Sequence, residues 1–433
     1  MLTDPRFIPR EGRTLVPGAS LSLNERDRRW KLARSEMKAR EIDCLIIIAR
    51  GYNSNGNVRW LDNGDYSERH LIFPLEGDPM NFWLLQNWGK WFTETCWEGV
   101  RYRGHEGKYS VVAVDTIKDL GYEGGKIGIV GLIGAGYAAE GSIPYMTFQN
   151  LKSLLPKAKF VDATNILTKA RMIKSKEEIA MIEKASELAN MEINTALKML
   201  KPGIRERDIM VEMDYVSMKA GAEFGRDHWT LLNSGEGYPV NHRDTNKIIQ
   251  NGEILQLGHY TRFAGYWSHP HVAISLGSMN AEAKGLRDAV LEGTTIALEL
   301  LKPGVEWSKV NKLVDEPILS RGYYHEVPQI HGTGLDGIEP PVTDVCAGNI
   351  PNQYEWREKS LEGSIENNTE WKTIAEESKT SKGELLVEEG MSLALEVKAA
   401  LEDRIAICFG PQIIVEKDGP RILNPDAMDV IEL

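Results

Sequence analysis

The chain has few cysteines, no long apolar run and no excess of basic charge. Its 433 residues include four cysteines, and no two of them form a Cys-x-x-Cys pair. This spacing argues against a disulfide scaffold or a structural zinc site and favours a reducing, cytoplasmic environment. The longest apolar runs are strand-sized, as in Cys44–Ala49, so we expect no membrane-spanning segment.

The charge balance excludes further classes of partner. The formal net charge is −12, from 51 basic and 63 acidic residues, so no basic face is expected for nucleic acid or anionic membrane. Residues 1–13 lack the apolar core of a secretory signal, which also favours the cytoplasm. The apolar content of 42% is that of a globular protein, and the length indicates about two domains.

Carboxylates are missing from one region that is rich in histidine. Residues 254–281 contain neither Asp nor Glu, yet they carry His259, His269 and His271. The segment is typical of two strands that meet at Ala264-Gly265. If His269 and His271 lie on a strand, they share one face of it. The pattern indicates a site for a metal or a substrate.

The first domain is predicted to span residues 1–165 and to have an α/β fold. Glu25–Arg40 has the pattern of a charged amphipathic helix, and Cys44–Ala49 that of a buried strand. Further strands are expected at residues 81–85, 126–130 and 159–161. Alternation of strands with helical stretches predicts an α/β sheet domain.

The second domain, residues 172–433, contains an internal repeat. Ser175 and Glu178 form a capping box that begins a long helix. Ala196–Ile209 and Ala297–Val310 both read as helix, Lys-Pro-Gly, helix. The repeat predicts a duplicated half-domain with a pseudo-two-fold axis and one curved sheet. The polar stretch at about 343–388 is expected to be a surface insertion or a covering loop.

Several short motifs lie across the start of the second domain and along its length: Arg171–Ser175, Asn251–Ile254, Ala264–Tyr266, His331–Leu335, Glu339–Pro341, Glu388–Met391 and Leu395–Glu396. In this order they resemble motifs of the pita-bread family, which includes creatinase, prolidase and aminopeptidase P. The resemblance covers residues 24–433. It implies a creatinase-like α/β N-terminal domain followed by an α+β pita-bread catalytic domain with a pseudo-two-fold axis.

The metal ligands of the family are only partly retained. The family's metallopeptidases hold two divalent ions with two Asp, one His and two Glu. By resemblance, these positions fall in turn at Gly258, His269, His331, Glu396 and Gly410. Bridging carboxylates offset the charge of two cations, so we expect no dinuclear metal site and no cofactor. One alternative is a single ion held by His269, His331 and Glu396.

The resemblance to creatinase and the ectoine hydrolases predicts a metal-independent hydrolase of a small polar C–N compound. The substrate would be an amidine, a cyclic amide or an N-acyl amine. His242 or His331 would activate water, and Glu396 would shuttle a proton or hold a cationic nitrogen. The residues expected to bind substrate are His259, His269, His271, Glu339, Tyr66 and Arg69.

Two other interpretations of the same residues stay open. One is a hydrolase or lyase with the single ion described above. The other is a catalytically silent protein that binds a ligand in a pita-bread pocket. For both the metal-independent hydrolase and the single-ion enzyme, the expected partner is a small-molecule substrate. The family pattern also predicts a homodimer in which Tyr66 and Arg69 of one chain lie near the site of the other.

Overall fold

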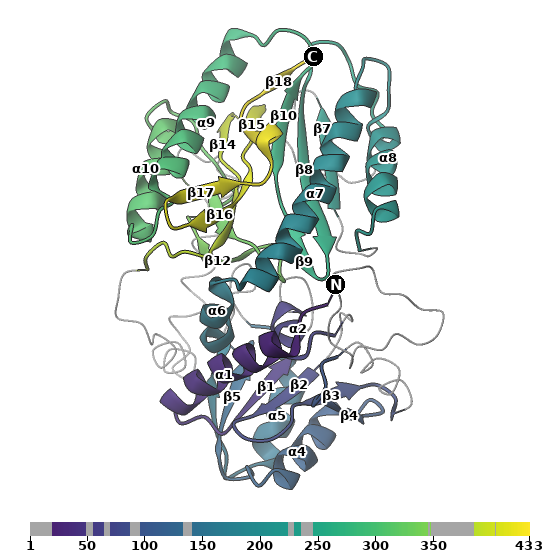
Figure 1. Ribbon diagram of the computed structural model, residues 1–433, viewed down its shortest axis with the longest axis vertical. Coiled ribbons are helices and arrows are strands. Elements are labelled where there is room, and N and C mark those ends of the chain that lie inside the picture. The colour runs from purple at the N-terminus through teal and green to yellow at the C-terminus, as the bar shows by residue number, and fades with distance from the viewer. Residues whose placement is uncertain are drawn as a thin grey trace. The chain divides into compact units, whose positions relative to one another are not determined.

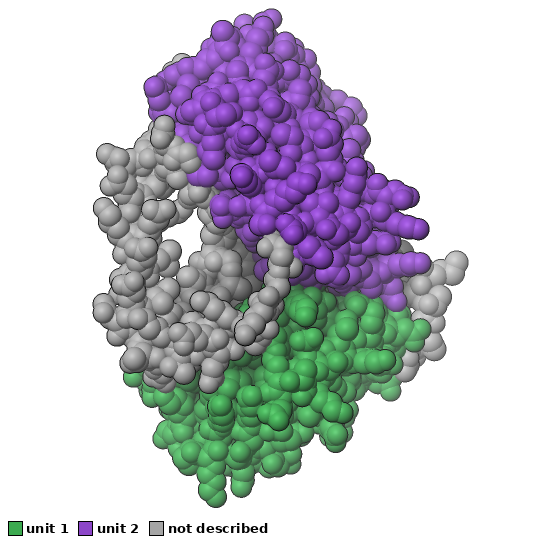
Figure 2. All heavy atoms as spheres, turned by 90° about the vertical axis from the view of Figure 1, so that its left-hand side faces the viewer, with its two compact units in different colours: residues 1–171, 361–382 green, residues 172–360, 383–433 purple. Residues whose placement is uncertain are grey.

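The computed structural model describes residues 20–48, 55–64, 70–86, 96–132, 141–223, 229–234, 246–344, 347, 385–402 and 404–433. The chain divides into two compact units, which Figure 2 colours separately. Unit 1 comprises residues 1–171 and 361–382, and unit 2 comprises residues 172–360 and 383–433. Among the described residues, no helix is long and apolar enough to cross a membrane.

Unit 1 is built on a mixed six-stranded sheet with the order β4-β3-β2-β1-β5-β6. Strand β1 pairs antiparallel with β2 and parallel with β5. The strands are β1 (Cys44–Ile48), β2 (His70–Pro74), β3 (Met80–Trp83), β4 (Arg101–Gly104), β5 (Lys126–Val130) and β6 (Lys159–Asp162). The helices among its described residues are α1 (Leu23–Ala39), α2 (Asn55–Asp62), α4 (Tyr109–Asp119), α5 (Tyr145–Leu154) and α6 (Thr164–Met172).

Strand β1 shows why this unit folds as an α/β domain. All five of its residues are buried, as expected of a central strand covered on both faces. Its side chains join an apolar cluster with those of α4 and α5. The predicted α/β class of the N-terminal region is therefore confirmed.

The described part of unit 2 contains two five-stranded sheets and a two-stranded ribbon. The first sheet has the order β18-β10-β8-β7, with β9 paired to β8, and the second has the order β12-β11-β13-β16-β17. The ribbon joins β14 to β15. The strands are β7 (Trp229–Ser234), β8 (Ile254–Phe263), β9 (Tyr266–Ser268), β10 (His271–Ser275), β11 (Ile330–Gly332), β12 (Glu339–Val342), β13 (Ser392–Leu395), β14 (Lys398–Leu401), β15 (Ile405–Cys408), β16 (Gln412–Glu416), β17 (Gly419–Ile422) and β18 (Ile431–Glu432).

Two helix pairs cover these strands, as Figure 1 shows. Helix α7 packs on α8, and α9 packs on α10. Helix α7 also contacts β8 and β9, whereas α9 contacts β14 and β15. The helices are α7 (Lys176–Met199), α8 (Glu206–Lys219), α9 (Ala281–Leu300) and α10 (Trp307–Leu319), and a short 3-10 helix η3 (Pro425–Ala427) follows β17.

The two Lys-Pro-Gly turns are held in the same way, which confirms the predicted internal repeat. Gly203 and Gly304 both have φ of +90°, a left-handed conformation that favours glycine. The Gly203 N–H donates to the Ile249 carbonyl, and the Gly304 N–H donates to the Val387 carbonyl, each over 2.9 Å. Equivalent β-bridges follow in both copies. The expected single curved sheet is instead divided into separately paired sheets, between which His271 and Gly410 form an isolated β-bridge.

Local sequence signals set the ends of several elements in unit 2. The Ser175 hydroxyl accepts from the Glu178 N–H (3.1 Å), and the Glu178 carboxylate accepts from the Ser175 N–H (2.9 Å), which is the predicted capping box. Ala264 and Gly265 both have positive φ and form the predicted hairpin turn between β8 and β9. Most of the predicted insertion at 343–388 lies outside the described residues.

Candidate functional site

Four predicted site residues meet inside unit 2, and we call them the histidine cluster: His269, His271, His331 and Glu396. His271 begins β10, and His269 precedes that strand by two residues. His331 lies in β11 opposite Ala394 of β13, and Glu396 follows β13 directly. All four residues are buried, with exposed fractions of 0–9%. Strand pairing therefore brings side chains from distant parts of the chain to one point.

The polar atoms of the histidine cluster lie close together. The Nε2 atoms of His269 and His271 are 2.7 Å apart, so one proton is shared between the two imidazoles. Oε1 of Glu396 is 3.6 Å from Nε2 of His271, and Oε2 is 3.6 Å from Nε2 of His331. Each carboxylate oxygen thus faces a different imidazole. Two metal–ligand bonds of about 2.0–2.2 Å at a tetrahedral angle span about 3.4 Å, which matches these separations.

The ring of His331 is oriented for use as a ligand. Its Nδ1 lies 2.9 Å from the Gly332 carbonyl, which can only accept, so Nδ1 carries the proton. The lone pair is then on Nε2, which is buried and has no hydrogen-bond partner among the described residues. In most metal-binding histidines one ring nitrogen binds the ion, and the N–H of the other donates to a backbone carbonyl or a carboxylate.

Gln412 fixes the backbone at His269 and was not identified from the sequence. Its Oε1 accepts from the His269 N–H (2.7 Å), while its Nε2 donates to Thr333 Oγ1 (2.9 Å) and Ser392 Oγ (3.0 Å). The ring of Tyr260 lies against His269, with centroids 3.8 Å apart. No motif singles out a lone glutamine at the start of a strand, so only the structure assigns it this position.

Cys408 and Lys398 adjoin the histidine cluster, and both were also missed in the sequence. They face each other across the β14–β15 ribbon. Burial raises the pKa of the Cys408 thiol well above its ordinary value, as does the carboxylate of Glu396. Burial also lowers the pKa of Lys398 to about 7, and its ammonium group contacts Glu326. A thiol and an amine therefore border the histidine cluster without belonging to it.

The residues present do not fit the two-ion site of two Asp, one His and two Glu that the resemblance implies. Gly258 and Gly410 take the place of two of the carboxylates. A Cβ atom built on Gly410 would lie 2.3 Å from the Leu395 carbonyl oxygen, so that position cannot hold a side chain without moving the backbone.

A single ion fits the histidine cluster. The ligating atoms of His269, His331 and Glu396 lie within 4.8 Å of one another. Two imidazoles and one carboxylate suit zinc or ferrous iron and leave coordination positions open for water and substrate. We call these three residues the metal site.

Glu339 is buried but belongs to a different set of contacts. Its carboxylate pairs with Lys174 at 3.0 Å and accepts from the Asp336 N–H at 2.9 Å. The pair fixes the loop after β11, and a direct role of Glu339 in substrate binding stays a prediction. His242, Tyr66, Arg69 and the side chain of His259 lie outside the described residues. The expected homodimer also stays a prediction.

Lys174→Met is expected to lower the free energy of unfolding by about 3–5 kcal/mol, because it leaves a buried carboxylate without its cation. The pair is almost fully buried, with exposed fractions of 2% and 5%. Lys184→Met is the matched control, since its pair with Glu187 is exposed and contributes about 1 kcal/mol or less. Urea unfolding of both variants measures the difference. Equal stability of the two variants would contradict the assignment.

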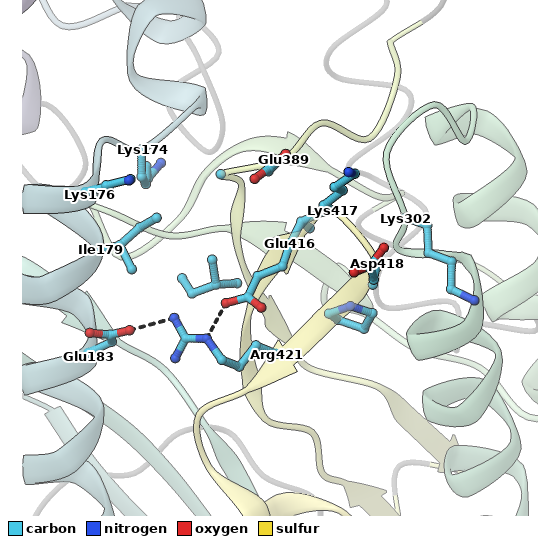
Figure 3. A pocket seen from close by; sticks show the side chains of 15 residues that line it. Lys174, Lys176, Ile179, Glu183, Lys302, Glu389, Glu416, Lys417, Asp418 and Arg421 are labelled. Carbon is cyan, nitrogen blue, oxygen red and sulfur yellow. Dashed lines mark hydrogen bonds and ion pairs between the residues drawn. The ribbon is translucent and has the colours of Figure 1, made fainter.

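Unit 2 also has an open groove of about 1040 Å³ beside the start of α7 and the β16–β17 hairpin (Figure 3). Arg421 crosses it and pairs with Glu183 and Glu416, each at 2.5 Å. Lys176, Lys302 and several acidic side chains share the lining. No residue of the histidine cluster lines this groove, and its charges are mixed, so it does not indicate a particular ligand.

Comparisons with known proteins agree with the fold. Residues 180–417 match the model of metallopeptidase family M24, and residues 29–173 match the creatinase/prolidase N-terminal domain. The prolidase of Pyrococcus horikoshii has a TM-score of 0.69 at 22% identity, covering 92% of this chain and 97% of that one. The Xaa-Pro dipeptidase of Bacillus anthracis has a TM-score of 0.71 at 17% identity, covering 94% and 100%. At these identities the likeness shows the fold.

Curated relatives are similar over part of their length. The Xaa-Pro dipeptidase of Pyrococcus furiosus is 29% identical over 205 residues, which are 47% of this chain and 59% of that protein. An uncharacterized peptidase of Bacillus subtilis, YqhT, is 24% identical over 249 residues, covering 57% and 67%. The match thus spans about three fifths of the first relative's length.

These findings correct the predicted activity. The prediction of a metal-independent, creatinase-like hydrolase of non-peptide C–N bonds is wrong, because the named relatives are peptidases and three buried residues that could hold a metal ion lie together. The prediction counted the carboxylates lost at Gly258 and Gly410. It gave too little weight to His269. At this position a histidine stands in place of the family's second Asp, and its imidazole nitrogen can still bind a metal.

Proposed function

Because the chain belongs to metallopeptidase family M24, we propose that it is a metal-dependent peptidase with one ion bound by His269, His331 and Glu396. The observation that carries this proposal is the convergence of three buried ligating groups within 4.8 Å. The orientation of His331 supports it, since its lone pair faces Glu396 across 3.6 Å. Two acceptor atoms at that separation repel unless a proton or a cation lies between them.

Metal-dependent peptide hydrolysis uses a Lewis acid, and the metal site would hold it. A divalent ion bound there would polarise the carbonyl of the scissile bond and make water more acidic. His331 is held in one tautomer by Gly332, so its Nε2 needs no rearrangement to serve as a ligand. Burial of all three ligands keeps bulk water from competing with the substrate.

Glu396 and His271 are the groups placed to handle protons, and we call them the proton-transfer pair. Glu396 directs Oε2 toward His331 and keeps Oε1 on the side of His271. Oε1 can take a proton from attacking water, and His271 Nε2, 3.6 Å away, can receive it and pass it to the departing amine. Proton transfer by a positioned side chain typically contributes about 10²–10⁴ in rate.

A small peptide is the proposed substrate, since the similar protein of Pyrococcus furiosus carries the name Xaa-Pro dipeptidase. Incubation with a chelator is expected to remove the ion and stop hydrolysis of a panel of dipeptides that includes Xaa-Pro sequences. Zinc, cobalt or manganese added back should restore turnover, because the chain itself supplies only ligands and proton carriers. Metal content and rate are measured on the same samples.

The control is the same chain passed through buffer without chelator, which should keep both its metal and its rate. Dipeptide turnover that persists after the metal content has fallen far below one equivalent would contradict the proposal. Tight binding of dipeptides without any turnover, with or without metal, would indicate a binding protein instead.

A further inference from the structure

A second group of ligating side chains adjoins the metal site. His271, Glu396 and Cys408 are all buried, and their ligating atoms lie within 4.8 Å of one another. Glu396 belongs to both groups, and Cys408 ends β15. The amine of the neighbouring Lys398 contacts Glu326, and that carboxylate offsets the repulsion that an incoming cation would meet from the protonated amine.

The place of His271 in the sheet connects this group with the two lost carboxylates. His271 lies opposite Gly258 in β8 and forms a β-bridge with Gly410. Residues directly opposite each other on paired strands project their side chains to the same face. The imidazole of His271 is therefore on the face to which carboxylates at Gly258 and Gly410 would project. In this chain the imidazole nitrogen of His271 can thus stand in for the carboxylate oxygens that are absent at positions 258 and 410.

Glu396 is placed to serve two ions at once. Its Oε1 and Oε2 each lie 3.6 Å from a different imidazole, those of His271 and His331. This separation is close to the roughly 3.4 Å between two ligands of one tetrahedral ion. Each oxygen is thus placed to share an ion with its own histidine, and the carboxylate would be a ligand at both positions.

Gln256 lies beside His271, and its amide would supply the outer contact of a ligating imidazole once it is turned over. Its Nε2 lies 3.4 Å from His271 Nδ1, while its Oε1 is buried and has no hydrogen-bond partner among the described residues. Amide oxygen and nitrogen exchange places when the amide group turns over. The oxygen then accepts from a protonated Nδ1 and leaves the Nε2 lone pair for a metal ion.

We infer that His271, Glu396 and Cys408 form a second, thiolate-containing ion position whose occupancy inhibits the enzyme. The inference rests on the proposed function, because the second ion would occupy the proton-transfer pair. Binding breaks the S–H bond of Cys408, releases that proton to solvent and forms a metal–thiolate bond, with no change of oxidation state. A sulfur ligand favours zinc, cobalt or cadmium over manganese and magnesium.

Cobalt titration of the metal-free full chain tests the inference. The first equivalent should support turnover without a sulfur-to-cobalt charge-transfer band. The second should produce that band in the near ultraviolet, release about one thiol proton and lower the rate on the order of 10²-fold, as expected when a proton-transfer pair is blocked. Manganese in excess should support turnover without inhibition.

Cys408→Ser should lose the band, the second equivalent and the inhibition, while the rate with one equivalent stays at the wild-type value. Cys44→Ala is the matched control, because Cys44 is equally buried in a strand but belongs to neither ligand group. That variant should keep all three properties. The cobalt titration of the wild-type chain already shows whether a sulfur-to-cobalt band appears at the second equivalent. The test therefore gives a result even if a variant fails to fold.

The possible failures are distinct. Binding that stops at one equivalent, or a band that survives Cys408→Ser, would overturn the second position and leave the proposed function standing. Inhibition by manganese equal to that by cobalt would overturn the thiolate assignment. Two bound equivalents with a Cys408-dependent band but no dipeptide turnover would support the ion position and reject the proposed function and, with it, the inhibition.

Discussion

His331→Ala is expected to remove stoichiometric metal binding and to lower dipeptide turnover by roughly 10²–10⁴-fold. His331 is fully buried, and its lone pair faces Glu396 across 3.6 Å. Without it the metal site keeps two of its three ligands. Loss of a Lewis acid that contributes several kcal/mol to the transition state produces a rate loss of this size. Metal analysis of the purified variant and steady-state kinetics measure the two effects.

His325→Ala provides the matched control for this variant. His325 is also fully buried in unit 2, where its Nδ1 donates to the Val327 carbonyl and its Nε2 lies 3.3 Å from Asp315. It is not part of the histidine cluster, so its removal should lower stability but leave metal content and specific activity unchanged. Equal losses of metal and activity in both variants would show that buried histidines act through folding alone.

Gly410→Ala is expected to destabilise unit 2 by about 3 kcal/mol and to weaken metal binding. The added Cβ would lie 2.3 Å from the carbonyl oxygen of Leu395 and 2.8 Å from its carbonyl carbon. These are backbone atoms, so relief of the clash must move the end of β13. Glu396 follows Leu395 directly and would be displaced from His331. For the same reason, a glutamate at position 410 should not restore the family's carboxylate ligand.

Gly124→Ala is the control for this prediction, since its added Cβ would meet only Lys157, at 3.9 Å. It should change the free energy of unfolding by about 0.5 kcal/mol or less. Chemical denaturation and metal affinity are measured for both variants. A Gly410→Ala protein as stable as the wild type would mean that the crowding at Leu395 has been overestimated.

Sequence patterns predicted features that depend on residues near one another in the chain. The buried run at Cys44–Ile48, the capping box of Ser175 and Glu178, and the hairpin turn at Ala264-Gly265 all have the expected form. Each is set by short-range hydrogen bonds, by backbone conformation or by the burial of one apolar run. The repeated Lys-Pro-Gly turns then predicted the duplicated architecture.

Alternation along the chain also predicted part of the site. His269 and His271 are two residues apart and were expected to share a face, and their Nε2 atoms are in fact 2.7 Å from each other. His331 and Glu396 were candidates because of the family resemblance. What the sequence could not supply was their separation, because it depends on how β11 pairs with β13.

Only the tertiary structure decided which chemistry these residues can perform. Comparison of motifs showed that carboxylates are absent at Gly258 and Gly410, and from that we predicted a metal-free enzyme. The folded chain brings nitrogen, oxygen and sulfur atoms together from β10, β11, β15 and the end of β13. Cys408 joins them only through the β14–β15 pairing, which no local signal marks. A metal ion binds atoms in space rather than positions in a motif, so strand register determines whether a ligand set exists.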